Sequence, residues 1–247
     1  MTAVSILAWH LNGPVVQQRQ NIATPEFIPW VWQRQEDLSF LAPGTKVALW
    51  IATVDIGENI RPQLRQNPAI LPENAAVIAV IRIEALNESL PAINALAETL
   101  MALYLPTGAN QLQLDFDATV SQRQYYKALL QALRVRLGAT PLSITALASW
   151  CMGDPWVDDL PIDYAIPMLY RMGYDTARIN QDLATGSHFS ARVCSHNAGY
   201  STDEERVPLP GLERIFLFND KPWTESTYAS ITEELRTGSG HIPGQTP

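Results

Sequence analysis

Eight short segments rich in β-branched and other apolar residues recur along this chain, separated by longer connections. The segments are SILAWH (5–10), KVALWIATV (46–54), AVIAVIRIE (76–84), QLQLDFD (111–117), PLSITAL (141–147), YAIPMLYR (164–171), ARVCSH (191–196) and RIFLFN (214–219). Four connections, residues 90–104, 121–137, 175–185 and 225–236, repeat apolar residues every three or four positions, as amphipathic helices do. Short strands that alternate with helices indicate parallel strands joined by crossovers.

Eight such strands in 247 residues match the arithmetic of a (β/α)8 TIM barrel, in which loops at the carboxyl ends of the strands hold the functional residues. We therefore expect one α/β barrel domain over residues 1–236, with some outer helices irregular or missing, and a flexible tail over residues 237–247. A doubly wound open sheet is the alternative. It has less support, because NGPVVQQ after the first segment fits neither the dinucleotide fingerprint nor the Walker pattern. No cofactor is expected.

Charge and hydropathy exclude two kinds of partner. With 25 acidic and 17 basic residues the net charge is -8, so the chain lacks the general basic surface that neutralises nucleic-acid phosphates. No apolar run approaches the roughly 20 residues that a membrane-spanning helix needs. The first residues show no basic segment before their apolar stretch, which predicts no export signal and a cytoplasmic location unless the gene start is truncated. Oligomeric state is left open.

The two cysteines and the histidines give weak signals. Cys151 and Cys194 are too few for a disulfide scaffold and lack the close spacing of a zinc or redox pair, so we expect two buried thiols. His10 and His196 lack the HExxH spacing or a visible third ligand, and no metal site is expected.

The fourth segment carries the strongest sign of chemistry. Because side chains alternate along a strand, Gln113, Asp115 and Asp117 share the face opposite to the apolar residues 112, 114 and 116. The apolar face should meet the helices, which leaves two carboxylates about 6.6 Å apart along the strand pointing into the barrel. Arg82 and Glu84 alternate in the same way on the preceding segment, and Arg82 is placed to compensate Asp115.

Paired carboxyl groups at a barrel mouth suit glycoside hydrolysis. In that reaction one carboxyl group protonates the leaving oxygen, and the other attacks the anomeric carbon or activates water. We expect Asp117 to be the acid/base, Glu84 to be the second carboxylate, and Asp115 and Arg82 to tune them. The alternative is that these four residues form a structural network, in which they satisfy one another's charges inside the barrel and have no catalytic role.

Further polar and aromatic residues fall at the expected carboxyl ends of other segments. Tyr170 ends the sixth segment and is placed to orient a substrate. The remaining candidates for substrate binding are His10, Trp50, Thr145, His196 and Asn219. Together they predict a polar cleft with aromatic walls, and loop tryptophans such as Trp30 and Trp32 are possible platforms for sugar rings. A loop or capping role is the alternative for each residue alone.

The segments LQLDFDAT, QYYKALLQALRVRL, LSITALASW and IPMLYRMG resemble an uncharacterised bacterial family of unknown function with a glycosidase-like TIM barrel. More distantly, LDFDAT and PMLY are similar to the DxDxE and MxYD segments of chitinase-like glycosidases. Asp115 and Asp117 match the last two aspartates of that motif, and Tyr170 matches its tyrosine. Thr119 stands where the motif has its proton-donating Glu, and Arg171 stands where it has Asp.

This resemblance implies a carbohydrate ligand and leaves three functions open. In a hydrolase, Asp117 or Glu84 has taken over proton donation. In a glycan-binding or scaffold barrel, the catalytic Glu has been lost and sugar is bound without being cut. In a different barrel hydrolase or lyase, a third carboxylate or a histidine converges with Asp117.

Overall fold

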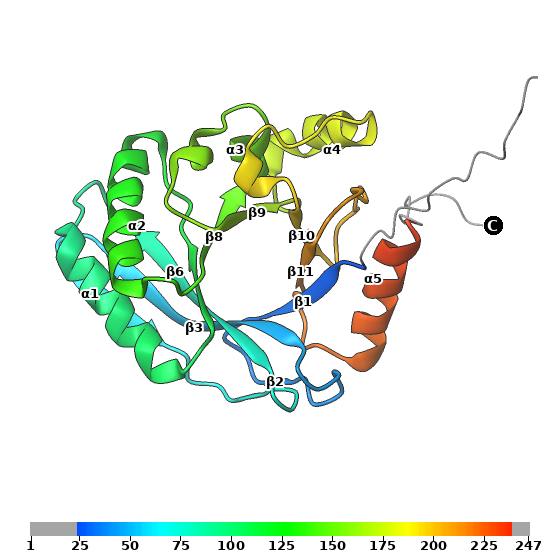
Figure 1. The fold of residues 1–247 in the computed structure, drawn as a ribbon, viewed down its shortest axis with the longest axis horizontal. Helices are drawn as coiled ribbons and strands as arrows, with labels where there is room; N and C mark the ends of the chain where they lie inside the picture. Colours follow the sequence, from blue (N-terminus) through cyan, green and yellow to red (C-terminus); the bar gives the residue numbers. More distant parts are fainter. Residues whose placement is uncertain (1–23, 239–247) are drawn as a thin grey trace, which may run out of the picture.

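The computed structural model describes residues 24–238, and its main sheet is a closed barrel of eight parallel strands (Figure 1). The strands are β1 (Glu26–Val31), β3 (Lys46–Ile56), β6 (Ala76–Ala85), β7 (Gln111–Asp115), β8 (Leu142–Leu147), β9 (Tyr164–Met168), β10 (Asn197–Ser201) and β11 (Arg214–Phe218). Each strand pairs in parallel with the next, and β1 pairs with both β11 and β3, which closes the ring. The prediction of a (β/α)8 barrel is confirmed.

Helices cover the barrel unevenly. They are α1 (Ile93–Tyr104), α2 (Arg123–Leu137), α3 (Ala148–Met152), α4 (Thr176–Ala184) and α5 (Glu225–Thr237), with short 3-10 turns η1 (Leu105–Thr107), η2 (Val120–Gln122), η3 (Trp156–Asp159), η4 (Gly173–Asp175) and η5 (Arg192–Cys194). In Figure 1, α1 and α2 lie on one side of the ring and α5 lies on the other. The four predicted helices agree with α1, α2, α4 and α5 to within about three residues.

Three connections within the described residues contain no α-helix. After β1 the chain forms β2 (Glu36–Asp37), which pairs with β5 (Ala69–Ile70), and after β3 it turns back as β4 (Ile60–Leu64), antiparallel to β3. The connection from β10 to β11 is an irregular loop. The expectation of missing outer helices is therefore confirmed. None of the described helices is long and apolar enough to cross a bilayer.

One of the eight predicted strands differs from the structure, and another lies outside the described residues. The first barrel strand is β1, whereas residues 5–10 lie outside the described residues. The strand predicted at 191–196 is wrong, because η5 occupies this stretch and β10 begins at Asn197. A Cβ atom on Gly199, in the middle of β10, would lie 3.2 Å from the Phe218 ring and 3.3 Å from a methyl group of Ile166. Space inside the barrel, rather than strand propensity, thus selects the sequence NAGYS for this strand.

The alternation of the strands separates an inner and an outer core. Leu112, Leu114 and Phe116 pack outward against the helices, and the Phe116 ring meets the Tyr126 ring of α2 edge-on at 5.1 Å between centroids. The interior holds a separate cluster that includes Ile28, Trp30, Ala48, Ile78, Val80, Tyr164, Ile166, Phe216 and Phe218. This arrangement sends every second residue of β7 inward, including Asp115, as the sequence pattern predicts.

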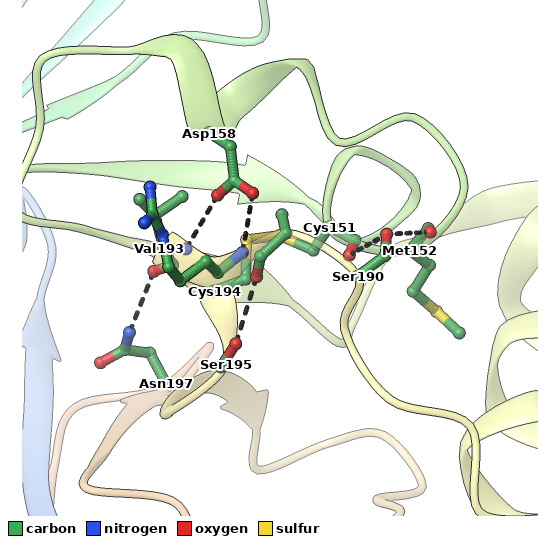
Figure 2. Close-up of a disulfide and its surroundings, with 10 residues drawn as sticks. Cys151, Met152, Asp158, Ser190, Val193, Cys194, Ser195 and Asn197 are labelled. Carbon is green, nitrogen blue, oxygen red and sulfur yellow. Dashed lines mark hydrogen bonds between the residues drawn. A yellow bond between two sulfur atoms is a disulfide. The ribbon is translucent and has the colours of Figure 1, made fainter.

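The expectation of two free thiols is wrong, because Cys151 in α3 and Cys194 in η5 form a disulfide (Figure 2). Their Cα atoms lie 5.9 Å apart although 43 positions separate them in sequence. Hydrogen bonds hold the same junction, since the Asp158 carboxylate accepts from the backbone N–H groups of Arg192 and Val193 at 3.0 Å each. The disulfide therefore fastens the β8–β9 connection to the β9–β10 connection.

Candidate functional site

Three adjoining cavities lie at the carboxyl end of the barrel, and we call them together the mouth cleft. The central cavity, of about 280 Å³, is lined by Trp32, Arg82, Asp115, Asp117, Leu147, Ala148, Ser149, Met168, Tyr170, Arg171, Met172, Asp175 and Ile179. The Asn219 cavity, of about 350 Å³, shares Trp32, Tyr170 and Arg171 with it. The Glu84 cavity, of about 130 Å³, shares Arg82, Asp115 and Asp117. The shared walls make one continuous depression across the barrel mouth.

Asp115 is the buried acid of the mouth cleft. It is the last residue of β7, only 8% of its surface is exposed, and the hydroxyl of Thr145 on β8 donates a 2.5 Å hydrogen bond to its Oδ1. The pKa of Asp115 is raised to about 6, because burial, together with the negative charges of Asp117 and Glu84, outweighs the Thr145 hydrogen bond and the Arg82 cation, which lower it. A carboxyl group in this range can exchange a proton near neutral pH.

Asp117 lies two residues further along, where the chain has left β7. It is exposed and lines both the central cavity and the Glu84 cavity. Its pKa is raised by partial desolvation, an effect that the Arg82 cation opposes and the Glu84 charge reinforces. The two aspartates therefore line the same two cavities but have different access to water.

Arg82 and Glu84 stand on the adjacent strand β6. Arg82 Nε donates to Glu84 Oε1, and Arg82 Nη1 lies 4.0 Å from Asp115 Oδ2, so the guanidinium sits between the two acids. Desolvation lowers the pKa of Arg82, but the charges of Asp115 and Glu84 outweigh it and the net shift is upward. Glu84 lines the Glu84 cavity and is absent from the walls of the central cavity.

Aromatic side chains form the wall opposite β7. The Tyr170 ring packs on Phe218 with 4.5 Å between centroids, Phe218 packs on Trp30 at 4.5 Å, and Trp30 contacts Trp32 at 5.7 Å. Tyr170 and Trp32 both line the central and Asn219 cavities. Burial raises the pKa of Tyr170 well above its usual value, so its phenol stays neutral and can donate a hydrogen bond.

The other residues predicted to bind substrate lie in different parts of the structure. Thr145 supports Asp115 from below, and Asn219 lines the Asn219 cavity, where its Oδ1 accepts a 2.6 Å hydrogen bond from Thr202. Trp50 is buried in the barrel and lines none of the three cavities. The placement of His196 at the mouth is wrong: it precedes β10, at the amino end of the strand, because the strand starts later than the pattern predicts. His10 lies outside the described residues.

The sequence reading missed several residues of the mouth cleft. Arg171 lines two cavities, and Leu147, Met168 and Met172 give the central cavity an apolar side. Arg34 fixes the loop after β1, because its Nη2 donates to the Asn219 carbonyl at 2.5 Å and its Nε to Glu36 at 2.8 Å. The sequence could have indicated Arg171, because it directly follows Tyr170, which was predicted to lie at the barrel mouth. Nothing in the local sequence of Arg34 predicts its contact with Asn219, which follows the last barrel strand.

No group of three or more potential metal-ligating His, Cys, Asp or Glu side chains occurs among residues 24–238. Fold and site together define a (β/α)8-barrel protein with an acidic, partly aromatic cleft at the carboxyl ends of its strands. Comparison of the chain with protein-family models, with curated proteins and with solved structures finds no match. The resemblance to glycosidase-like barrels therefore stays a prediction.

Proposed function

We propose that this protein is a glycoside hydrolase-like enzyme that acts on a carbohydrate through the carboxyl groups of Asp115 and Asp117. One observation carries the proposal: a buried carboxyl group with its pKa raised to about 6 lies in the wall of an open cavity beside a second, more exposed carboxyl group. Carboxyl groups whose environments differ in this way are typical of acid/base catalysis.

The two environments suggest separate roles. Asp115 keeps a large share of its proton up to about pH 6 and can donate it to the glycosidic oxygen. Asp117 is more open to solvent than Asp115. Desolvation raises its pKa and the Arg82 cation opposes that shift, and in its ionised form Asp117 can attack the anomeric carbon or activate a water molecule. In this assignment Asp115 takes the acid role that the sequence alone suggests for Asp117, and Asp117 takes the role of second carboxylate that the sequence suggests for Glu84.

The surrounding residues would bind and orient the sugar. The neutral phenol of Tyr170 offers a hydrogen bond to a hydroxyl group, and the indole of Trp32 offers an apolar surface that matches the C–H face of a sugar ring. Glu84 is a positioning residue in this scheme, because it holds the Arg82 guanidinium next to Asp115.

A glycan-binding barrel without catalysis is the second candidate, and Thr119 favours it. Thr119 stands where the chitinase-like motif has its Glu, and here its backbone N–H donates to Gln122 Oε1 at 2.9 Å where the chain enters η2 and α2. The position thus serves to start a helix instead of supplying an acid.

The experiment is hydrolysis of a panel of neutral and acidic oligosaccharides by the purified protein, with release of reducing ends as the readout. We expect Asp115→Asn and Asp117→Asn each to lower kcat/KM by roughly 10²- to 10⁴-fold. Asp182→Asn, which changes a half-buried acid of α4 outside the mouth cleft, should have no effect. Equal rates for wild type and Asp117→Asn would remove Asp117 from the mechanism, and tight binding by the wild type without turnover would establish the second candidate.

A further inference from the structure

Arg171 lies at the junction of the central and Asn219 cavities and lines both. Its residue surface is exposed, and no Asp or Glu oxygen among the described residues lies within 4.0 Å of its guanidinium. The other two arginines of the mouth cleft are engaged, since Arg82 pairs with Glu84 and Asp115, and Arg34 pairs with Glu36 and two backbone carbonyls. Arg171 is therefore the cation of the cleft that is left for a ligand.

The backbone of Arg171 is held in an unusual conformation. Its φ of +52° lies in the left-handed region, which residues with long side chains rarely adopt. Both carboxylate oxygens of Glu204, on the β10–β11 connection, accept a hydrogen bond from the Arg171 N–H at 3.0 Å. Glu204 thus satisfies the backbone of Arg171 while its guanidinium stays unpaired. Strained residues of this kind gather at functional sites.

The segment that carries Glu204 is itself anchored. Arg206 donates to the carbonyl groups of Ser201 and Glu204 at 2.7 and 2.9 Å, and its guanidinium pairs with Glu234 of α5 at 2.7 Å. Arg206 and Glu234 are both largely buried in their side chains, at 10% and 16% exposure. A chain of contacts from α5 therefore fixes the strained backbone of Arg171 at the cleft.

The chemistry of the guanidinium indicates what it would bind. Arginine presents several N–H donors in a planar fork that matches the two oxygens of a carboxylate. Of the acids on the same walls, Asp175 is paired with Arg178 at 2.8 Å, and Glu84 and Asp115 share the single cation of Arg82. Asp117 lines the central cavity and Asp220 lines the Asn219 cavity. The free cation is thus matched to one anionic group on a ligand that spans both cavities.

We propose that Arg171 forms a subsite for a sugar carboxylate, so that the protein prefers acidic glycans that contain uronic acid residues over neutral glycans. This inference rests on the proposed function and specifies its substrate class. It places a uronate at the junction of the two cavities, next to the sugar that faces Asp115 and Asp117.

Matched ligand pairs test the subsite. Oligosaccharides of galacturonate, glucuronate and mannuronate are compared with their carboxyl-reduced counterparts, which keep the linkage and lose the charge. Binding is measured by calorimetry on Asp117→Asn protein, to limit turnover, and hydrolysis is measured on protein with Asp117 intact. We expect at least one uronate oligosaccharide to bind about 10- to 100-fold more tightly than its neutral counterpart, and this ratio to fall as salt is added.

Substitutions of Arg171 then assign the preference to one side chain. Arg171→Gln should abolish the preference, because it weakens the binding of acidic ligands more than that of their neutral counterparts. Arg171→Gly should do the same in a backbone that accepts the left-handed conformation, which keeps the test valid if the Gln variant folds poorly. Arg61→Gln, at an exposed arginine on β4 outside the cleft, should behave as the parent protein.

The outcomes separate the two proposals. Equal affinity for acidic and neutral glycans, or a preference that persists in Arg171→Gly, would overturn the subsite and leave a glycan-active barrel. If no glycan of either kind is bound or cleaved by protein with Asp117 intact, the proposed function fails and the subsite fails with it.

Discussion

Asp115 is a carboxyl group that the fold buries at the point where β7 opens into the mouth cleft. Its two direct partners, Thr145 and Arg82, do not offset the burial, because the pKa remains raised to about 6. The ionised form of Asp115 therefore costs stability in the folded protein. A carboxyl group kept in this condition beside an open cavity is what acid catalysis requires, and what a purely structural residue would avoid.

Asp115→Asn should stabilise the protein at neutral pH. Because folded Asp115 binds its proton more tightly than the unfolded chain, with a pKa of about 6 against 3.8, the wild type loses stability as the pH rises from about 4 to about 6. Asn keeps the oxygen that accepts from Thr145 and removes the charge. We expect the variant to gain up to roughly 3 kcal/mol above pH 7 and little below pH 4, measured by urea unfolding at a series of pH values.

A pH-independent difference between the two proteins would contradict the assigned cause. Asp182→Asn serves as the control, because this acid lies on α4, outside the mouth cleft, and pairs with Arg178 at 3.5 Å.

The pH dependence of activity should follow the same group. If Asp115 donates the proton, kcat/KM for glycoside hydrolysis falls as the pH rises above about 6, because the donor is then ionised. Glu84→Gln removes a negative charge that raises the pKa of Asp115, so this variant should shift the alkaline limb to lower pH. A profile that is flat between pH 5 and 8 would show that another group donates the proton.

At the scale of elements, sequence patterns predicted a strand and its inward residues where apolar and polar residues alternate strictly. β7 has a fully apolar outer face, and the inward placement of Asp115 followed from counting residues. β10 has no such pattern, because Asn197, Gly199 and Ser201 face a crowded interior and strand propensity is low. The apolar run ARVC next to it predicted the strand instead, which misplaced His196. A strand whose residues are selected by the space inside the barrel cannot be predicted from local sequence patterns.

The disulfide is the covalent feature of the connections around the cleft. Ala148 and Ser149, in the helix that contains Cys151, line the central cavity, and Cys194 anchors the far end of the connection that carries Arg171, Met172 and α4. Reduction should lower the free energy of unfolding by about 2–4 kcal/mol, because it releases the 43-residue closed loop. Chemical denaturation with and without reductant measures this loss.

A double Cys151→Ser, Cys194→Ser variant gives the matched control. It should unfold like the reduced wild type and respond no further to reductant. Thiol titration of the unfolded, unreduced protein should find no reactive group, and reduction should release two. Two reactive thiols before reduction would contradict the bond.

At the scale of the whole molecule, the barrel must close between its first and last strands, β1 and β11. Glu36, with 1% of its side chain exposed, bridges this seam: its carboxylate pairs with Arg34 at 2.8 Å and accepts from the Trp223 N–H at 2.8 Å. The Trp223 indole donates in turn to the Trp30 carbonyl at 2.9 Å. These contacts join the loop after β1 to the segment that follows β11.

Glu36→Ala should destabilise the protein by about 3 kcal/mol, because it leaves the Arg34 charge and the Trp223 N–H without their partner. Glu26→Gln is the matched control, since Glu26 forms an exposed pair with Lys46 at 2.7 Å between the neighbouring strands β1 and β3 and should cost less than about 1 kcal/mol. Thermal and denaturant unfolding measure both values. Equal losses of unfolding free energy in the two variants would show that the Glu36 contacts stabilise the barrel no more than an exposed ion pair does.

The sequence by itself determined the alternation of strands and helices, the parallel crossovers, and the inward direction of Arg82, Glu84 and Asp115, because these follow from local hydropathy and the two-residue period of a strand. Only the tertiary structure decided that β1 closes the ring, that Cys151 meets Cys194, that Glu84 faces a side cavity, and that Arg171 is left without an acidic partner. These outcomes depend on distances between residues far apart in the chain, and on burial, which changes the pKa of a carboxyl group without changing its sequence neighbours.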